Sequence, residues 1–208
     1  MTMFNKRKVF INAKMITIVD YEDSNATEVG ECIKQLTSEF VVSNSEIDIC
    51  RADKIIFPGN GHAFQAMKRL HVLNLFSVMR IIRKPILGIG LGMQLMADYS
   101  LEGNISCLGI FPGTAQKFEN GKMNVINEGM QSVSIKKESK LFHGINDDEK
   151  FYFHNTYYLP LSELTTSISK HNINFSASVE KNSSFGVQFH PEKSGVAGLQ
   201  MLSNFISL

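Results

Sequence analysis

Short apolar runs alternate with helically spaced apolar residues through the first half of the chain. Three runs have the apolar, β-branched character of buried strands: 15–20 (MITIVD), 54–57 (KIIF) and 85–89 (PILGI). Three intervening segments carry apolar residues at helical spacing: 26–39, 62–83 and 91–99. Strands that alternate with helices in this way predict a parallel sheet covered on both faces.

The second half of the chain has a different pattern, with strand-like segments and few helical ones between them. The expected strands are 131–135, 151–159, 175–179 and 185–189, and residues 194–208 form a final apolar helix. No repeat or linker divides the chain. We therefore expect an α/β fold, with a mostly parallel central sheet, helices on both faces and a β-rich second half. The domain should span 15–208, behind a basic N-terminal leader at 1–14.

Composition excludes several classes of protein. The 208 residues carry 21 Lys and Arg against 20 Asp and Glu, which argues against a densely basic nucleic-acid surface. No apolar run approaches the about 20 residues of a membrane span. The three cysteines, an odd number, provide no disulfide framework and fit a reducing, cytoplasmic location.

Ligands of open parallel sheets bind at the carboxyl ends of the strands, and three motifs fall there. The first is the turn Pro58–Gly61 after the second strand. Its glycines allow the backbone N–H groups to face an anion. Taken alone, such a motif is more often an ordinary turn between a strand and a helix.

The second motif, Gly88–Gln94 (GIGLGMQ), joins the third strand to its helix. Glycine, variable residue, nucleophile, variable residue, glycine is the pattern of a nucleophile elbow, a tight and strained turn. The central position is Gly90, which has no side chain. The dinucleotide fingerprint fits poorly, because Met93 stands where its third glycine should be.

The third motif is Val187–Ser194 (VQFHPEKS), in which an apolar strand ends at His190. Pro191 stiffens the turn so that Glu192 can reach the imidazole, fix its tautomer and leave the other nitrogen as a base. A helix start with Glu192 near the dipole explains the same residues equally well.

Together these motifs resemble the class I (triad-type) glutamine amidotransferases, in particular HisH-type glutaminase subunits of imidazole glycerol phosphate synthase. The resemblance runs from residue 15 to the C-terminus. It rests on six segments: 15–21 (MITIVDY), 57–64 (FPGNGHAF), 88–94, 108–113 (LGIFPG), 151–158 (FYFHNTYY) and 187–194.

The resemblance implies hydrolysis of glutamine to glutamate, with the ammonia passed to a HisF-type (β/α)₈ barrel synthase in a heterodimer. It implies a flavodoxin-like fold, and it implies no metal and no cofactor. In the family's Cys-His-Glu triad, His190 would be the general base and Glu192 the residue that orients it. Gly90 stands at the position of the nucleophilic cysteine.

The remaining roles also come from the resemblance. Gly59 to Gly61 would supply the oxyanion backbone, and Lys193 would face the partner. Three residues would hold glutamine: Gln94, Thr156 and Tyr157.

Departures from the family pattern bear on activity. Without a thiolate at Gly90 no acyl-enzyme can form, whereas glycine suits the backbone of the elbow. Cys32, Cys50 and Cys107 fall elsewhere in the predicted fold. Further departures are Glu22–Ser24 in place of glycines, Met130 in place of tryptophan and Asn155 in place of a common histidine.

Three hypotheses follow from these residues. The chain is a nucleophile-less subunit that acts as a scaffold or regulator of an ammonia-using synthase, in histidine biosynthesis or in another pathway such as sugar amidation. Alternatively, its parent is an active glutaminase and Gly90 is an inactivating substitution. A pure binding module for a small amide or anion is the third hypothesis, although it has no need of the His190 and Glu192 pair.

Overall fold

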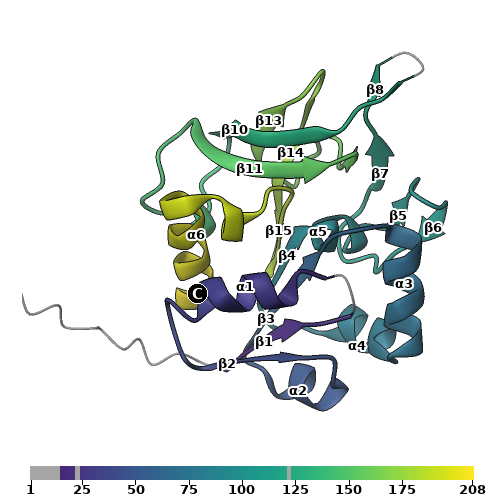
Figure 1. Cartoon of the computed structure of the whole chain (residues 1–208), viewed down its shortest axis with the longest axis vertical. Coiled ribbons are helices and arrows are strands. Elements are labelled where there is room, and N and C mark those ends of the chain that lie inside the picture. The colour runs from purple at the N-terminus through teal and green to yellow at the C-terminus, as the bar shows by residue number, and fades with distance from the viewer. Residues whose placement is uncertain (1–14, 22–23, 121–122) are drawn as a thin grey trace, which may run out of the picture.

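A nine-stranded mixed sheet forms the centre of the molecule in the computed structural model, which describes residues 15–21, 24–120 and 123–208 (Figure 1). The predicted leader at 1–14 lies outside the described residues. The strand order is β11-β10-β13-β14-β15-β4-β3-β1-β2. The predicted fold class is confirmed, with helices on both faces and a β-rich second half.

Five strands make the parallel half of this sheet. They are β1 (Ile16–Val19), β2 (Phe40–Ser43), β3 (Lys54–Gly59), β4 (Ile86–Gly90) and β15 (Ser184–Val187). Each pairs in parallel with its neighbour in the order β2-β1-β3-β4-β15. Their carboxyl ends therefore lie at one edge, where all three sequence motifs begin.

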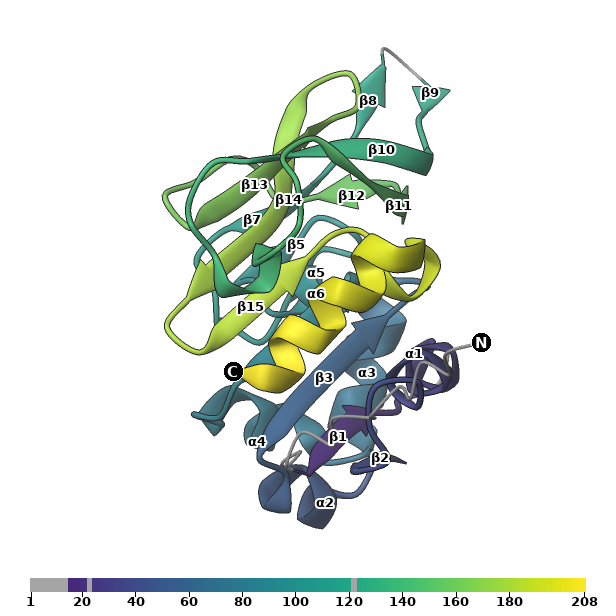
Figure 2. The ribbon, with the colours of Figure 1, turned by 90° about the vertical axis from the view of Figure 1, so that its left-hand side faces the viewer.

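Two helical layers enclose the parallel strands, and Figure 2 shows α6 in front of β3 and α3 behind it. One face carries α1 (Ala26–Ile33) and α6 (Gly195–Ser207); the other carries α3 (Ala63–Val72), α4 (Leu75–Ile81) and α5 (Leu91–Leu95). The short α2 (Glu46–Arg51) follows β2. Successive side chains of β3 point to opposite faces of the sheet. Ile55 and Phe57 therefore join the apolar cluster on one face, and Ile56 joins the cluster on the other.

The antiparallel half continues the sheet beyond β15. Its strands are β14 (Asn174–Lys181), β13 (Thr165–Lys170), β10 (Asn127–Ile135) and β11 (Glu149–Asn155). A smaller sheet holds β12 (Tyr157–Tyr158), β7 (Thr114–Lys117), β5 (Tyr99–Ser100) and β6 (Ile105–Ser106), and β8 (Glu119–Asn120) pairs with β9 (Met123–Asn124). Two 3₁₀ turns complete the fold: η1 (Lys140–Phe142) and η2 (Pro191–Lys193).

Three predicted helices are wrong in extent. The first ends at Ile33, and Phe40 instead begins β2, because its β-branched neighbours pair with β1. The predicted 62–83 helix is broken at Asn74, whose φ of 58° is left-handed. The elbow helix stops at Leu95, and Tyr99 lies in β5.

Among the described residues, none of the helices is both long enough and apolar enough to cross a membrane.

Candidate functional site

The elbow connects β4 directly to α5, and Gly90 is at once the last residue of the strand and the N-cap of the helix. Its φ of 59° and ψ of −119° lie in a region that side chains rarely adopt. The first turn of the helix also needs a glycine at residue 92, two positions after Gly90. A Cβ on Gly92 would lie 1.9 Å from the Phe57 carbonyl oxygen of β3. Small residues therefore permit the tight turn that the sequence motif predicts.

The space beside Gly90 is occupied by its neighbours. A Cβ at this position would lie 2.8 Å from the Gly59 carbonyl oxygen and 2.9 Å from Cε1 of His190. Both distances are shorter than a normal van der Waals contact. The structure thus has no room for a side chain at residue 90 unless the carbonyl or the imidazole moves.

His190 and Glu192 form a buried pair beside the elbow, with Nδ1 and Oε1 2.8 Å apart and both side chains less than 5% exposed. The His190 main chain is held at both ends. Its N–H donates to the Tyr152 carbonyl, and its carbonyl accepts from Ser194 Oγ. Nδ1–H donates to the carboxylate in this pairing, and Nε2 then faces the elbow, 3.1 Å from the position of a Cβ on Gly90.

The turn after β3 also borders the elbow, since Gly59 pairs with Gly90 across the parallel strands. The Gly59 carbonyl oxygen faces Gly90. In a trans peptide the N–H of Asn60 must then point away. The predicted oxyanion backbone at Gly59 to Gly61 therefore presents an acceptor here, and this peptide would have to turn over to donate an N–H.

A pocket of about 160 Å³ opens next to the elbow. It is lined by five residues that the sequence predicts for the site: Gly59, Gly61, Gln94, Thr156 and Tyr157. The structure brings these together from the ends of β3, α5 and β11–β12. Six further lining residues were not among the predicted site residues: Leu91, Glu102, Ile126, His154, Asn155 and Gln188.

Two of these additional residues contribute polar groups to the pocket wall. Glu102 accepts from the Ala63 N–H at 2.7 Å, which holds its carboxylate at the start of α3. Gln188 is fully buried, and its Nε2 has no hydrogen-bond partner among the described residues. The sequence did contain a signal for Gln188, because a residue two positions before His190 on an extended segment faces the same side. Glu102 had no such signal, since it reaches the site through a loop.

Side-chain amides are linked in a chain behind the pocket. The Tyr157 carbonyl accepts from Gln94 Nε2 and from Asn155 Nδ2, each at 2.8 Å. Gln94 Nε2 also donates to Gln188 Oε1 at 2.9 Å, and Asn155 Oδ1 accepts from Asn127 Nδ2 at 3.0 Å. A main-chain carbonyl can only accept, so this one fixes which way the neighbouring amides point. The Oε1 atom of Gln94 is left as an acceptor at the pocket.

None of the three cysteines lines the pocket. Cys50 is exposed on α2, and Cys32 is half-buried on α1. Burial raises the pKa of the Cys107 thiol to about 12, and burial followed by the Glu192 charge raises that of Cys32. Raised pKa values keep these thiols protonated near neutral pH, and a protonated thiol is a poor nucleophile.

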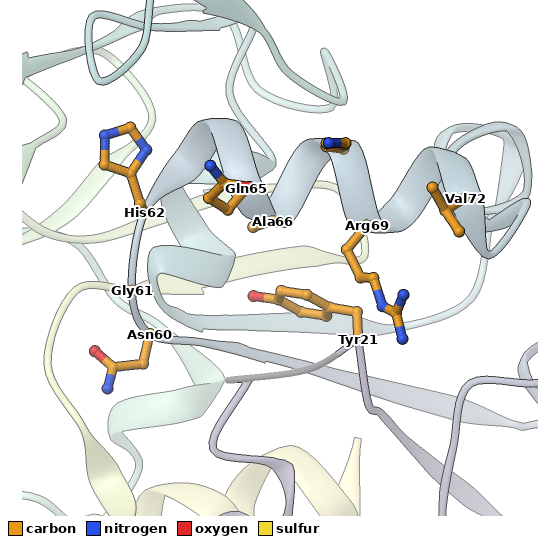
Figure 3. A pocket seen from close by; sticks show the side chains of 9 residues that line it. Tyr21, Asn60, Gly61, His62, Gln65, Ala66, Arg69 and Val72 are labelled. Atoms are coloured by element: carbon orange, nitrogen blue, oxygen red, sulfur yellow. The ribbon is translucent and has the colours of Figure 1, made fainter.

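A second cavity of about 460 Å³ lies beside the same turn, between Tyr21 and one face of α3 (Figure 3). It shares Asn60 and Gly61 with the first pocket. The Tyr21 ring is buried beneath the helix, and its burial followed by the Asp20 charge raises the pKa of the phenol. Tyr21 therefore remains a neutral hydroxyl that packs against Gly59.

Lys193, the predicted partner-facing residue, forms an ion pair within the chain. Its Nζ lies 3.1 Å from Glu28 Oε2 on α1, and both side chains are about half exposed. The pair links η2, which carries Glu192, to the first helix. A contact of Lys193 with a partner stays a prediction.

Comparison with known proteins gives a consistent result. The family model "Glutamine amidotransferase class-I" matches residues 17–208. Imidazole glycerol phosphate synthase subunit HisH of Bacteroides fragilis is 39% identical over 195 residues, covering 93% of this chain and 99% of that protein. The same subunit from Buchnera aphidicola is 35% identical, with the same coverage.

Solved structures share the fold. A chain in the PurLQS structure from Thermotoga maritima superposes with a TM-score of 0.68 at 16% identity, covering 94% of this chain and 98% of that one. At this identity the likeness concerns the fold alone.

Proposed function

The chain belongs to the class I glutamine amidotransferases, and from this premise we propose that it is the HisH-type subunit of a two-subunit synthase which retains the glutamine pocket but does not hydrolyse glutamine. The single observation that carries the proposal is Gly90 at the elbow, beside an assembled His190 and Glu192 pair.

Hydrolysis by a triad of this kind needs a thiolate. The sulfur attacks the side-chain amide carbon of glutamine, the C–N bond breaks as the imidazole protonates the departing ammonia, and water then hydrolyses the thioester. Gly90 has no atom that could form the bond to the amide carbon. The His190 base and Glu192 remain, but they have no nucleophile to activate.

The pocket keeps groups suited to an amino acid ligand. Gln94 offers an acceptor, and Glu102 places a carboxylate at the same wall, so the α-ammonium group of glutamine would be bound there. Thr156 and Tyr157 would hold the rest of the molecule. Binding of glutamine without turnover is the behaviour we assign to this pocket.

The curated relatives are named as subunits of imidazole glycerol phosphate synthase, which supports a synthase subunit as the partner. We propose a HisF-type (β/α)₈ barrel in a cytoplasmic heterodimer. Ile126 supports docking next to the pocket, because this apolar residue lines the pocket and is 55% exposed. Gly90 also favours a second candidate, a paralogue that regulates an ammonia-using synthase outside histidine biosynthesis.

Glutamate release measured with the purified partner tests the proposal. We expect the chain to be at least about 10³-fold slower than a cysteine-bearing HisH, as loss of a triad member predicts. The partner should still be active when ammonium salt replaces glutamine. Turnover comparable to that of the cysteine-bearing relative would contradict the proposal.

The Gly90→Cys variant separates the alternatives. Partner-dependent hydrolysis in this variant, abolished again by adding His190→Ala, would show that Gly90 alone removes activity and that the parent of this chain was an active enzyme. An inactive but folded Gly90→Cys variant would show that the site has changed beyond its nucleophile.

A further inference from the structure

A positively charged cleft lies at the edge of the sheet opposite to the elbow. Its volume is about 390 Å³, and it is formed by the segments before β4 and between β14 and β15, together with the turn at 109–110. Four cationic side chains line it: Arg80, Arg83, Lys84 and Lys181. None of the residues that line it is Asp or Glu.

Main-chain carbonyl groups hold three of these cations in place. Lys84 Nζ donates to the carbonyls of Cys50 and Ala52 at the end of α2. Lys181 Nζ donates to the Ile110 carbonyl at 3.2 Å. Arg83 donates to the carbonyl groups of Arg80 and Ile82 at 3.4 and 3.2 Å.

The fourth cation is held by an aromatic ring, since the Arg80 guanidinium lies 5.3 Å from the centre of the Phe76 ring. In the described part of the chain, none of the four cations forms an ion pair with a carboxylate. Carbonyl groups and an aromatic face orient a cation but leave its full charge uncompensated. The chain as a whole carries a formal charge of only +1, so the four charges are a local concentration.

Like charges confined in one cleft repel each other, and a multivalent anion removes that repulsion. Arginine forks match the oxygen geometry of phosphate, and lysine adds point charges. The hydroxyl groups of Ser183 and Ser184 also line the cleft and can donate to such oxygens.

The segments that line the cleft also contact β4 and the end of the α5 segment, which lie on either side of Gly90. Lys84 lies two residues before β4, which ends at Gly90. The opposite wall includes Gly109 and Ile110, whose N–H groups donate to Ala97 and Met96 at the end of the α5 segment, each at 2.8 Å. An anion in the cleft would therefore contact the segments that anchor the strand and the helix on either side of Gly90.

We propose that this cleft is a binding site for a small molecule with two or more phosphate groups. A short cleft lined by four cations and by no carboxylate fits a compact polyanion better than an extended acidic peptide, which would need a longer groove. The proposal does not depend on glutamine binding or on the partner.

Calorimetry on the full chain tests it, with pyrophosphate and a nucleoside triphosphate as probes and orthophosphate as the comparison with a single phosphate group. We expect saturable binding of the two polyphosphates that weakens as salt concentration rises. The double variant Arg80→Gln, Lys181→Gln should bind at least about 10-fold more weakly, the loss expected from two charge-assisted contacts. Lys84 is left intact because it caps α2.

The matched control is the double variant Lys136→Gln, Lys150→Gln, which removes the same charge from exposed positions in the antiparallel half. Its affinity should equal that of the parent chain, and circular dichroism should show both variants folded. Three results would overturn the proposal: no binding at millimolar probe, an equal loss in the control variant, or equally tight binding of a poly-glutamate peptide.

Discussion

At the scale of single residues, Gly90 determines what the site can do. The elbow demands a positive φ, and glycine adopts it without strain. The Gly59 carbonyl and the His190 ring lie within the space that a side chain would need. A side chain at this position would have to displace the carbonyl or the ring as well as adopt the positive φ.

The Gly90→Ala variant measures the cost in stability of fitting a side chain against the Gly59 carbonyl and the His190 ring. Gly144 is a matched control, because its φ is also positive, 72°, and nothing lies within 4 Å of its Cβ position. Both variants incur backbone strain, but only Gly90→Ala must also displace its neighbours. We expect Gly90→Ala to lower the free energy of unfolding by about 1–3 kcal/mol more than Gly144→Ala.

Urea denaturation of the two variants gives the comparison. Equal losses would mean that the carbonyl and the imidazole yield at no cost, and the site would then be open to a restored cysteine.

Separation along the chain decides which site residues the sequence could predict. His190 and Glu192 are two residues apart, so a local turn is sufficient to pair them. Glu102 and Asn155 become neighbours of the pocket only through tertiary packing of loops and of β10 on β11. No spacing rule links such residues along the chain.

At the scale of elements, the junction between β11 and β12 orders the pocket wall. The Tyr157 carbonyl directs the amides of Gln94 and Asn155, and through them those of Gln188 and Asn127. Asn155 is thus an integral member of this chain of amides. Inverting one amide in such a network places two acceptors or two donors face to face, which is costly in a buried site.

Asn155→Asp reverses the polarity at one point of the network. The new carboxylate cannot donate to the Tyr157 carbonyl, and its oxygen faces that carbonyl in a site where Asn155 is 7% exposed. We expect a loss of about 1–3 kcal/mol in the free energy of unfolding at pH 7. Asn174→Asp, at an exposed position of β14, should change it by less than about 0.5 kcal/mol.

Thermal and urea unfolding of both variants provide the values. A loss at Asn155 no larger than that at Asn174 would show that the amide chain contributes nothing to the stability of the pocket wall.

Element boundaries show where the sequence pattern is insufficient. The buried parallel strands β1, β3 and β4 are predicted because continuous apolar runs have few alternatives. The break at Asn74 is not, since a single left-handed residue leaves the apolar spacing of α3 and α4 almost unchanged. The two-residue strands β5 and β6 are too short to create a period and exist only through their partners.

At the scale of the whole molecule, the parallel half builds the elbow and the antiparallel half supplies much of the pocket wall. The two halves meet at β15, which pairs in parallel with β4 and antiparallel with β14. The motif that carries His190 follows this strand directly. The pocket and its apolar neighbour Ile126 therefore depend on the correct joining of the two halves.

Ile126→Glu tests docking at this edge. Placing a charge at an apolar contact of the proposed interface should weaken partner binding by about 10-fold or more. Ile81→Glu is the matched control, because Ile81 is 70% exposed at the end of α4, and no residue of α4 lines the pocket. Titration calorimetry with the barrel partner should show the loss for Ile126→Glu only. Identical affinities would place the interface elsewhere.

The position of β15 also has a consequence for how the chain acquires its structure. Ile86 pairs with Ser184, almost a hundred residues later, so one edge of β4 has no partner until the last part of the chain has been synthesised. Long-range parallel pairing of this kind forms slowly, because a large loop must close first. A nascent or C-terminally truncated chain would expose this edge strand to other chains, and aggregation during synthesis is the hazard that follows.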